Sequence, residues 1–205
     1  MNNKIFEYLD KLYPNPKCEL DYNKDYELLI ATLLSAQTTD KRVNKVTQVL
    51  FKKYPSIKEL SEAPIKDIED IIREIGTFRK KSIYIHEITT KLVHDNLNYI
   101  PNDRAYIESL PGVGHKTANV FLSNIYNEPA LAVDTHVARL SKRLGIAKDS
   151  DDVVKIEKKL MKKVPKERWS RTHHQLVLFG RYKCKAISPM CTDCEIREFC
   201  RYKNK

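Results

Sequence analysis

The segment LPGVGHKTANV, Leu110–Val120, has the most distinctive local pattern of this chain. Two of the chain's 5 glycines, Gly112 and Gly114, lie in it with one residue between them, and apolar residues at helical spacing lie on both sides. The segment is therefore a tight turn between two helices. It is not a nucleotide-binding P-loop, because that motif spaces its glycines more widely and places the second one directly before the lysine, where this chain has His115.

A turn of this kind can bind an anion. Backbone N–H groups at the start of the second helix point outward, and the positive end of the helix dipole faces the same way. Such a site has no base preference and suits a DNA phosphate, although a plain corner between two helices has the same pattern. Lys116 follows Gly114 by two residues. Its amine is either placed for attack on a bound sugar or is an ordinary solvated charge.

A second segment, ALAVDTHVARLSKRLG, runs from an apolar stretch into Asp134 and then into a helix that Gly145 ends. Asp134 or Thr135 caps this helix, and the free amides of the first turn hold an aspartate ionised there. Capping alone is one interpretation of Asp134. The other is a fixed carboxylate that faces a developing positive charge.

Four of the 5 cysteines lie near the C-terminus with the spacing C-x6-C-x2-C-x5-C, at Cys184, Cys191, Cys194 and Cys200. The segment has too few apolar residues to form a core of its own. A disulfide framework is disfavoured, because we expect a cytoplasmic protein whose thiols stay reduced. The pattern indicates a metal centre, either structural zinc or a [4Fe–4S] cluster, and the spacing alone favours the cluster only modestly.

The rest of the sequence predicts an all-α protein. Residues 25–37, 40–54, 65–76 and 81–96 repeat apolar residues in amphipathic helical patterns, separated by short Pro or Gly breakers. No apolar run approaches the roughly 18 residues of a membrane helix, and the first residues have helical spacing rather than a signal peptide, so we expect a cytoplasmic location.

The net charge of +10 is unevenly distributed: residues 130–205 carry 19 basic and 9 acidic side chains. This asymmetry indicates either a polyanionic partner or a solvated lysine-rich surface.

Together these segments closely resemble one family, the endonuclease III branch of the helix-hairpin-helix DNA glycosylases. The matching motifs, in order and spacing, are LLSAQTTD, LPGVGHKTANV, AVDTHVARLSKRLG, HHQLVLFGRYKC and the four cysteines. The resemblance covers essentially the whole chain. It implies an all-α, two-lobed helix-hairpin-helix fold with a C-terminal iron–sulfur cluster loop. Residues 19–129 would form a helical lobe, and residues 1–18 plus 130–205 a lobe that holds a [4Fe–4S] cluster on the four cysteines.

The resemblance also implies a function in base-excision repair. The protein would be a DNA N-glycosylase that removes oxidised or ring-damaged pyrimidines and an AP lyase that cleaves the strand 3′ to the abasic site by β-elimination. Lys116 would be the nucleophile and Asp134 would stabilise the sugar cation, with the two facing each other across a cleft that binds double-stranded DNA. We expect a monomer that associates with the nucleoid through DNA. The implied DNA contacts are Gln37, Gly112, Gly114, His115, Thr117, His136 and Lys183.

Thr77 stands where the family often has a large apolar wedge, so either Thr77 or Phe78 would enter the duplex.

Two alternative functions share most of the motifs. An adenine-mismatch glycosylase of the same superfamily lacks the lysine found here at Lys116 and usually has a further C-terminal domain. A non-catalytic iron–sulfur DNA-binding protein would not need both Lys116 and Asp134.

Overall fold

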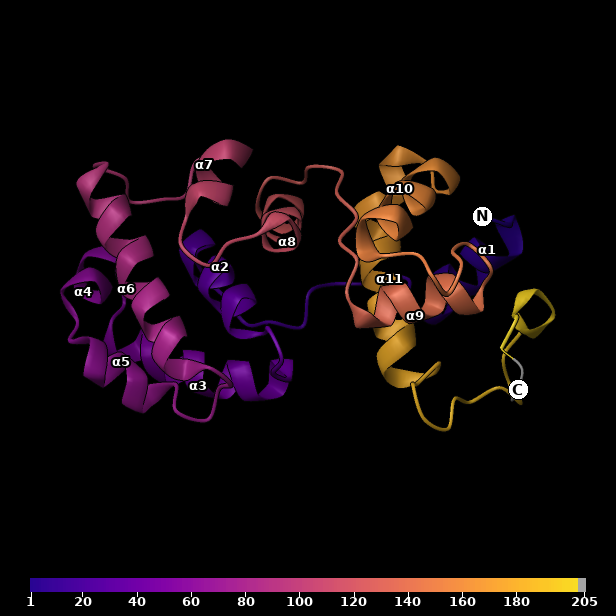
Figure 1. Cartoon of the computed structure of the whole chain (residues 1–205), viewed down its shortest axis with the longest axis horizontal. Helices are drawn as coiled ribbons and strands as arrows, with labels where there is room; N and C mark the ends of the chain where they lie inside the picture. Colours follow the sequence, from indigo (N-terminus) through magenta and orange to yellow (C-terminus); the bar gives the residue numbers. More distant parts are fainter. Residues whose placement is uncertain (203–205) are drawn as a thin grey trace. The chain divides into compact units, whose positions relative to one another are not determined.

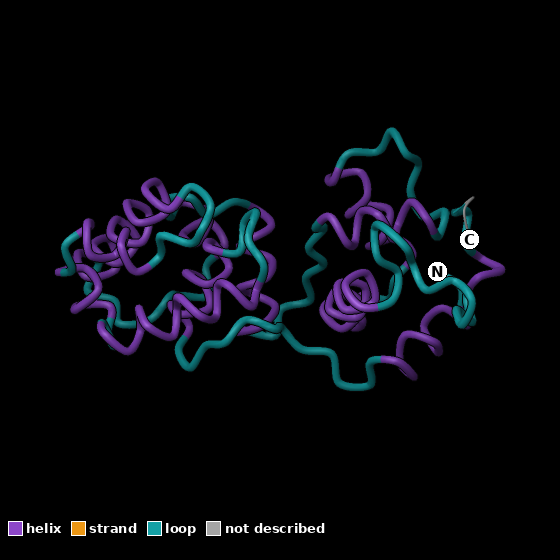
Figure 2. The backbone as a smooth tube through the Cα atoms, turned by 90° about the horizontal axis from the view of Figure 1, so that it is seen from below, coloured by secondary structure: helices purple, strands orange, loops and turns teal. Residues whose placement is uncertain are grey.

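The computed structural model describes residues 1–202, and these form helices and loops without any strand (Figure 2). The all-α prediction is therefore confirmed. The chain divides into two compact units: Glu19–Tyr126 is one, and Met1–Cys18 joins the chain from Asn127 onward in the other. Within residues 1–202, no helix has both the length and the apolar character needed to cross a membrane.

The unit Glu19–Tyr126 is built around α2. Its helices are α2 (Asp25–Leu34), α3 (Asp40–Lys53), α4 (Ile57–Glu62), α5 (Ile65–Ile71), α6 (Phe78–His94), α7 (Arg104–Ser109) and α8 (His115–Ile125) (Figure 1). Helix α2 packs against α3, α6 and α8, and every residue from Tyr26 to Leu34 is buried. The prediction that this run is amphipathic was wrong, because a helix that is apolar on nearly all sides belongs in the middle of a core.

The other unit joins the first helix to the last third of the chain. It contains α1 (Asn3–Leu12), α9 (Thr135–Arg143), α10 (Val153–Lys163) and α11 (Trp169–Tyr182), with short 3-10 turns η1 (Lys166–Arg168) and η2 (Arg197–Phe199). Leu9 from α1, Leu140 from α9 and Phe179 from α11 are buried in one core. Asp10 reinforces the packing of α1 on α11, since it accepts a hydrogen bond from Gln175 at 2.8 Å.

Candidate nucleic-acid interface and cysteine pocket

The predicted turn between two helices is present, between the end of α7 and the start of α8. Leu110 and Val113 are buried, and the Val113 N–H donates to the Leu110 carbonyl at 3.0 Å, which closes the turn. Gly112 has a φ of +75°, in the left-handed region. A Cβ atom at Gly112 would also lie only 2.4 Å from Cδ2 of Tyr84, so the turn sits directly on a ring of α6.

Neither the left-handed backbone nor the close contact found at Gly112 applies to Gly114. Its φ of −106° is open to any residue, and a Cβ atom there would meet no protein atom within 4 Å. Gly114 is the N-cap of α8 and provides no side-chain hydrogen bond to the first-turn N–H groups. These N–H groups have no carbonyl partner within the helix. The start of α8 therefore presents N–H groups that the helix does not use, beside an N-cap that has no side chain, which is the geometry of an anion site.

The residues at the start of α8 differ in how firmly they are held. Lys116 is exposed, and within residues 1–202 its side chain has no hydrogen bond or ion pair. His115 lies 3.4 Å from a Glu108 carboxylate oxygen of α7, and its Nε2 lies 3.2 Å from Nδ2 of Asn119. Thr117 is half-buried. Lys116 is thus an exposed cation in the first turn that can reach a ligand without first breaking an interaction.

Gln37 lies in the loop that follows α2 in the same unit. It is exposed and has a φ of +60°, an uncommon conformation for a residue other than glycine. Thr77, just before α6, is also exposed and left-handed, with a φ of +56°. Phe78 is half-buried, and its ring is covered by Arg79 at 5.2 Å. Of the two candidate wedge residues, Thr77 is therefore the more accessible.

Asp134 lies in the other unit, where it is the N-cap of α9. Its Oδ1 accepts a hydrogen bond from the Val137 N–H at 2.8 Å, so Asp134 rather than Thr135 caps the helix. The segment before it, residues 130–133, is buried, and His173 Nδ1–H of α11 donates to the Ala132 carbonyl at 2.8 Å. The Asp134 residue is half-buried, and the backbone is held after it by its own cap on α9 and before it by the hydrogen bond from His173.

His136 packs between α9 and α11. A Cβ atom at Gly180 would lie 2.8 Å from the His136 Cβ, and Arg139 lies 3.2 Å from its Nδ1. Burial lowers the pKa of His136, and the negative charge of Asp134 partly opposes this. These contacts hold the His136 ring between Arg139 and α11, next to Asp134.

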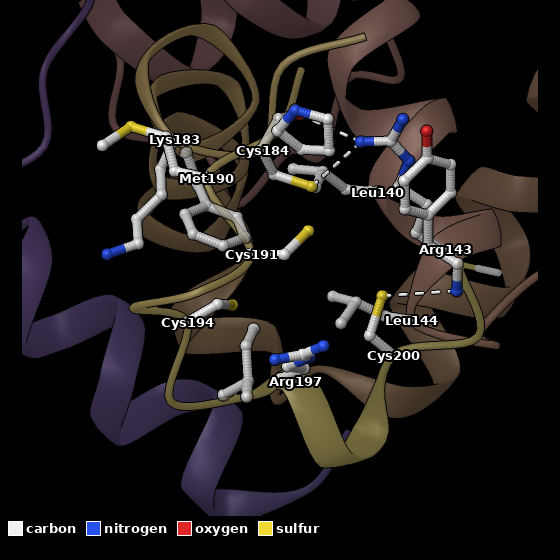
Figure 3. Close-up of a pocket in the computed structure, with 14 residues that line it drawn as sticks. Leu140, Arg143, Leu144, Lys183, Cys184, Met190, Cys191, Cys194, Arg197 and Cys200 are labelled. Carbon is white, nitrogen blue, oxygen red and sulfur yellow. Dashed lines mark hydrogen bonds between the residues drawn. The ribbon is translucent and has the colours of Figure 1, made fainter. Parts of the chain in front are cut away.

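The four late cysteines line a single pocket, together with apolar side chains that include Leu140 and Phe179 (Figure 3). None is in a disulfide, and residues 1–202 contain no group of three His, Cys, Asp or Glu side chains placed to hold a single metal ion. The sulfurs accept hydrogen bonds: Cys184 Sγ from Arg143 at 3.2 Å, Cys200 Sγ from the Tyr202 N–H at 3.4 Å, and Cys194 Sγ from the Ile196 N–H. Burial raises the pKa of the Cys184 thiol, and the bond from Arg143 opposes this.

Lys183 lines the same pocket but is directed away from the sulfurs (Figure 3). Its ammonium lies 5.7 Å from the centre of the Tyr8 ring, and a hydrogen bond with the Tyr8 hydroxyl raises its pKa. It is half-buried, whereas Lys185, two residues later, is exposed. Lys183 therefore joins the segment that carries the four cysteines to α1, whereas Lys185 is one of the exposed cations of this segment.

Two arginines that the sequence did not single out bind the segment that carries the four cysteines, residues 184–200. Arg139 donates to the carbonyls of Gly180 at 2.7 Å and Cys184 at 3.1 Å. Arg143, one turn later on α9, donates to the Lys185 carbonyl at 2.8 Å and lies 4.0 Å from the Tyr202 ring. Their i, i+4 spacing is a sequence signal for a shared helix face, but not for what that face contacts.

Comparisons with known proteins agree with this fold. Residues 30–166 match the family described as HhH-GPD superfamily base excision DNA repair protein. Endonuclease III of Bacillus subtilis (strain 168) is 46% identical over 209 residues, which cover 100% of this chain and 95% of the relative. Endonuclease III of Escherichia coli (strain K12) is 41% identical over 202 residues, 98% of this chain and 95% of the relative. A solved structure of a trapped endonuclease III–DNA covalent intermediate has a TM-score of 0.91 and 45% identity, and covers 98% of this chain and 96% of that chain.

An all-α fold with an uncapped hairpin turn and a family match over most of its length defines a helix-hairpin-helix protein of base-excision repair. The relatives place the chain in one family within this class, because the sequence identity to endonuclease III extends over nearly the full length of both chains. The chain belongs to the HhH-GPD superfamily and, within it, to the endonuclease III family. It is a DNA glycosylase and AP lyase that acts on DNA.

Proposed function

We propose that Lys116 is the nucleophile and that Asp134 is the carboxylate that stabilises the sugar cation. The observation that carries this proposal is the position of Lys116, exposed and without a side-chain partner in residues 1–202, in the first turn of a helix whose amides are uncapped. A phosphate on those amides would bring a deoxyribose next to its amine. The similar protein captured as a covalent DNA intermediate supports an enzyme-bound nucleophile.

The reaction begins when the damaged nucleotide leaves the base stack, a step that costs least for a base that already pairs poorly. Substrates are oxidised or ring-damaged pyrimidines in double-stranded DNA, and Gln37 fills the gap that the nucleotide leaves. The Lys116 amine forms a bond to C1′ while the bond from C1′ to the base breaks. The carboxylate of Asp134 offsets the positive charge that develops on the sugar.

The amine then loses a proton, the bond from C1′ to the ring oxygen O4′ breaks with a proton taken up by O4′, and a Schiff base forms between Lys116 and the opened sugar. Removal of a proton from C2′ allows β-elimination, in which the bond from C3′ to the 3′ phosphate oxygen breaks. The strand is cleaved on the 3′ side of the lesion, and hydrolysis of the Schiff base frees the lysine. The backbone amides of the hairpin turn hold the DNA throughout.

We propose further that Cys184, Cys191, Cys194 and Cys200 hold a [4Fe–4S] cluster. The residues fit this group, because four thiols line one pocket and their sulfurs accept hydrogen bonds from N–H groups, as sulfur ligands of such clusters commonly do. When bound, the cluster would supply a cross-link for a segment with little core, and we assign it no redox step in base excision. We propose that residues 19–129 form one lobe and that residues 1–18 plus 130–205 form the lobe that holds the cluster. We also propose that the protein is cytoplasmic and associates with the nucleoid through DNA.

Borohydride trapping tests the assignment of the nucleophile. Wild-type protein mixed with DNA that contains an abasic site should form a reduced covalent adduct, and Lys116→Gln should form almost none. Asp134→Asn is the matched control: its side chain can still cap α9, and no base has to leave from this substrate. It should keep much of its trapping but lose roughly 100-fold or more of the excision rate on a damaged base. Normal trapping by Lys116→Gln would show that another amine is the nucleophile.

A further inference from the structure

Lys81 is a buried lysine on α6 that the reaction described above does not use. Its side chain is 6% exposed, and its ammonium donates to the carbonyl oxygens of Leu34 at 3.0 Å and Ala36 at 2.7 Å. Within residues 1–202 it forms no ion pair with a carboxylate. Burial lowers the pKa of Lys81. A charged side chain is seldom buried in this way without a carboxylate, so its two carbonyl contacts require an explanation.

The two carbonyls belong to the end of α2 and to the loop that carries Gln37. The last carbonyls of a helix have no partner within the helix, and Lys81 supplies donors at this end from a different helix. The loop is short: the Thr38 N–H donates to the Ser35 carbonyl at 3.1 Å, and Gln37 lies between them with its φ of +60°. The ammonium of Lys81 therefore holds the residue directly before Gln37.

The same helix also carries the second exposed loop of this unit. The Lys81 N–H donates to the Thr77 carbonyl at 3.1 Å, so the backbone of Lys81 holds Thr77 while its side chain holds the Gln37 loop. Tyr84, almost one turn later on α6, supports Gly112 of the hairpin turn. The positions 77, 81 and 84 have the spacing of one helical face. Three exposed loops of the unit are thus attached to one face of α6.

We propose that Lys81 is a positioning residue that fixes the Gln37 loop relative to the Thr77 loop, so that both meet the duplex in one rigid arrangement. This inference rests on the proposed role of Gln37. Two flexible loops would have to be ordered each time a nucleotide leaves the stack, whereas loops fixed in advance avoid that entropy cost. The alternative is that Lys81 only caps α2, which would affect stability but not one substrate more than another.

The experiment compares Lys81→Met, Gln37→Ala and the double variant in single-turnover assays. One substrate is a duplex with one oxidised pyrimidine, where a gap must be filled. The other is a single strand with an abasic site, which has no partner strand and no gap. Lys91→Met is the matched control, because it removes a lysine from the same helix at a position whose carboxylate partner is Asp95.

We expect Lys81→Met and Gln37→Ala each to slow excision from the duplex on the order of 10- to 100-fold, the range for misplacement of a group by about 1 Å. The double variant should be no slower than the single variants, because both changes remove one function. Lys81→Met should cleave the single-stranded abasic site at the wild-type rate. Lys91→Met should match wild type on both substrates.

Losses that multiply in the double variant, or a loss by Lys81→Met that is equal on both substrates, would overturn the inference. A Gln37→Ala protein with wild-type excision would instead show that the proposed role of Gln37 is wrong. If Lys81→Met does not fold, Lys81→Gln keeps one donor and replaces it in the same comparison. Failure of both variants to fold would mean that Lys81 serves the core, and the inference would be rejected.

Discussion

The two glycines of the hairpin turn, two positions apart, should respond in opposite ways to the same substitution. In Gly112→Ala the new Cβ atom enters a residue with a φ of +75° and lies 2.4 Å from Tyr84 Cδ2. The left-handed conformation alone costs an L-residue roughly 1–2 kcal/mol, and the ring must also move. We expect a loss of at least about 2 kcal/mol in the free energy of unfolding, or a fall of about 4–8 °C in the melting temperature.

In Gly114→Ala the new Cβ atom meets no protein atom within 4 Å, and the φ of −106° is open to alanine. Alanine is a poorer N-cap than glycine, but it also restricts the unfolded chain, and these effects offset each other to within about 0.5 kcal/mol. Stability should therefore be unchanged. DNA affinity should fall on the order of 10- to 100-fold, because the methyl group occupies the approach to the amides and one or two charge-assisted hydrogen bonds are lost.

The assays are thermal unfolding of the free proteins and fluorescence anisotropy with a duplex that contains a stable abasic analogue. The decisive quantity is the contrast between the variants: Gly112→Ala loses stability, and Gly114→Ala loses affinity while it stays fully folded. Equal losses of stability in the two variants would refute the assignment of Gly112 as the conformational glycine. Unchanged affinity in Gly114→Ala would refute the hairpin turn as the phosphate contact.

Three further outcomes are expected. Metal and sulfide analysis of the purified protein should find iron and labile sulfide near the stoichiometry of one [4Fe–4S] cluster and little zinc. The Cys191→Ser variant should lose the iron and become poorly soluble. An active, colourless protein that contains one zinc ion would contradict the cluster assignment. In anisotropy titrations, log K against log salt should have a slope of about −4 to −5 if around five phosphates are neutralised, whereas a slope near zero would place the basic surface away from DNA. Burial raises the pKa of Asp10, but hydrogen bonds from Arg168, Gln175 and Arg171 outweigh it and lower the pKa to about 2. Because this lies below the unfolded value of about 3.9, the stabilisation is present above that pH and is lost as the pH falls through about 2. Urea unfolding at several acidic pH values should therefore show a smaller acid-induced loss of stability for Asp10→Asn than for wild type.

Much of the fold and of the candidate site follows from local sequence. Helical periodicity predicted the all-α class, and the glycines at 112 and 114 predicted a turn with a free helix end, because both depend on residues close together in the chain. For the same reason the sequence predicted that Asp134 or Thr135 caps the next helix, and the structure shows that Asp134 does. The cysteine spacing predicted that four thiols would serve one site, and all four line one pocket.

Other features depend on residues that only the folded chain brings together. The run RKK in the first turn of α6 has the pattern of solvated charge, yet Lys81 turns inward and its ammonium donates to carbonyls more than forty positions earlier in the chain. Its place four residues before the buried Ile85 was the one available signal. Nothing local indicated that Tyr84 would support Gly112, or that Arg143 would hold the cysteine segment. Likewise α2 had an apparent amphipathic pattern, and only the packing of α3, α6 and α8 around it decided that it is buried on all sides. Local patterns fix which backbone a segment prefers, whereas the partner of a long side chain depends on which helices pack together, and that is decided by the core as a whole.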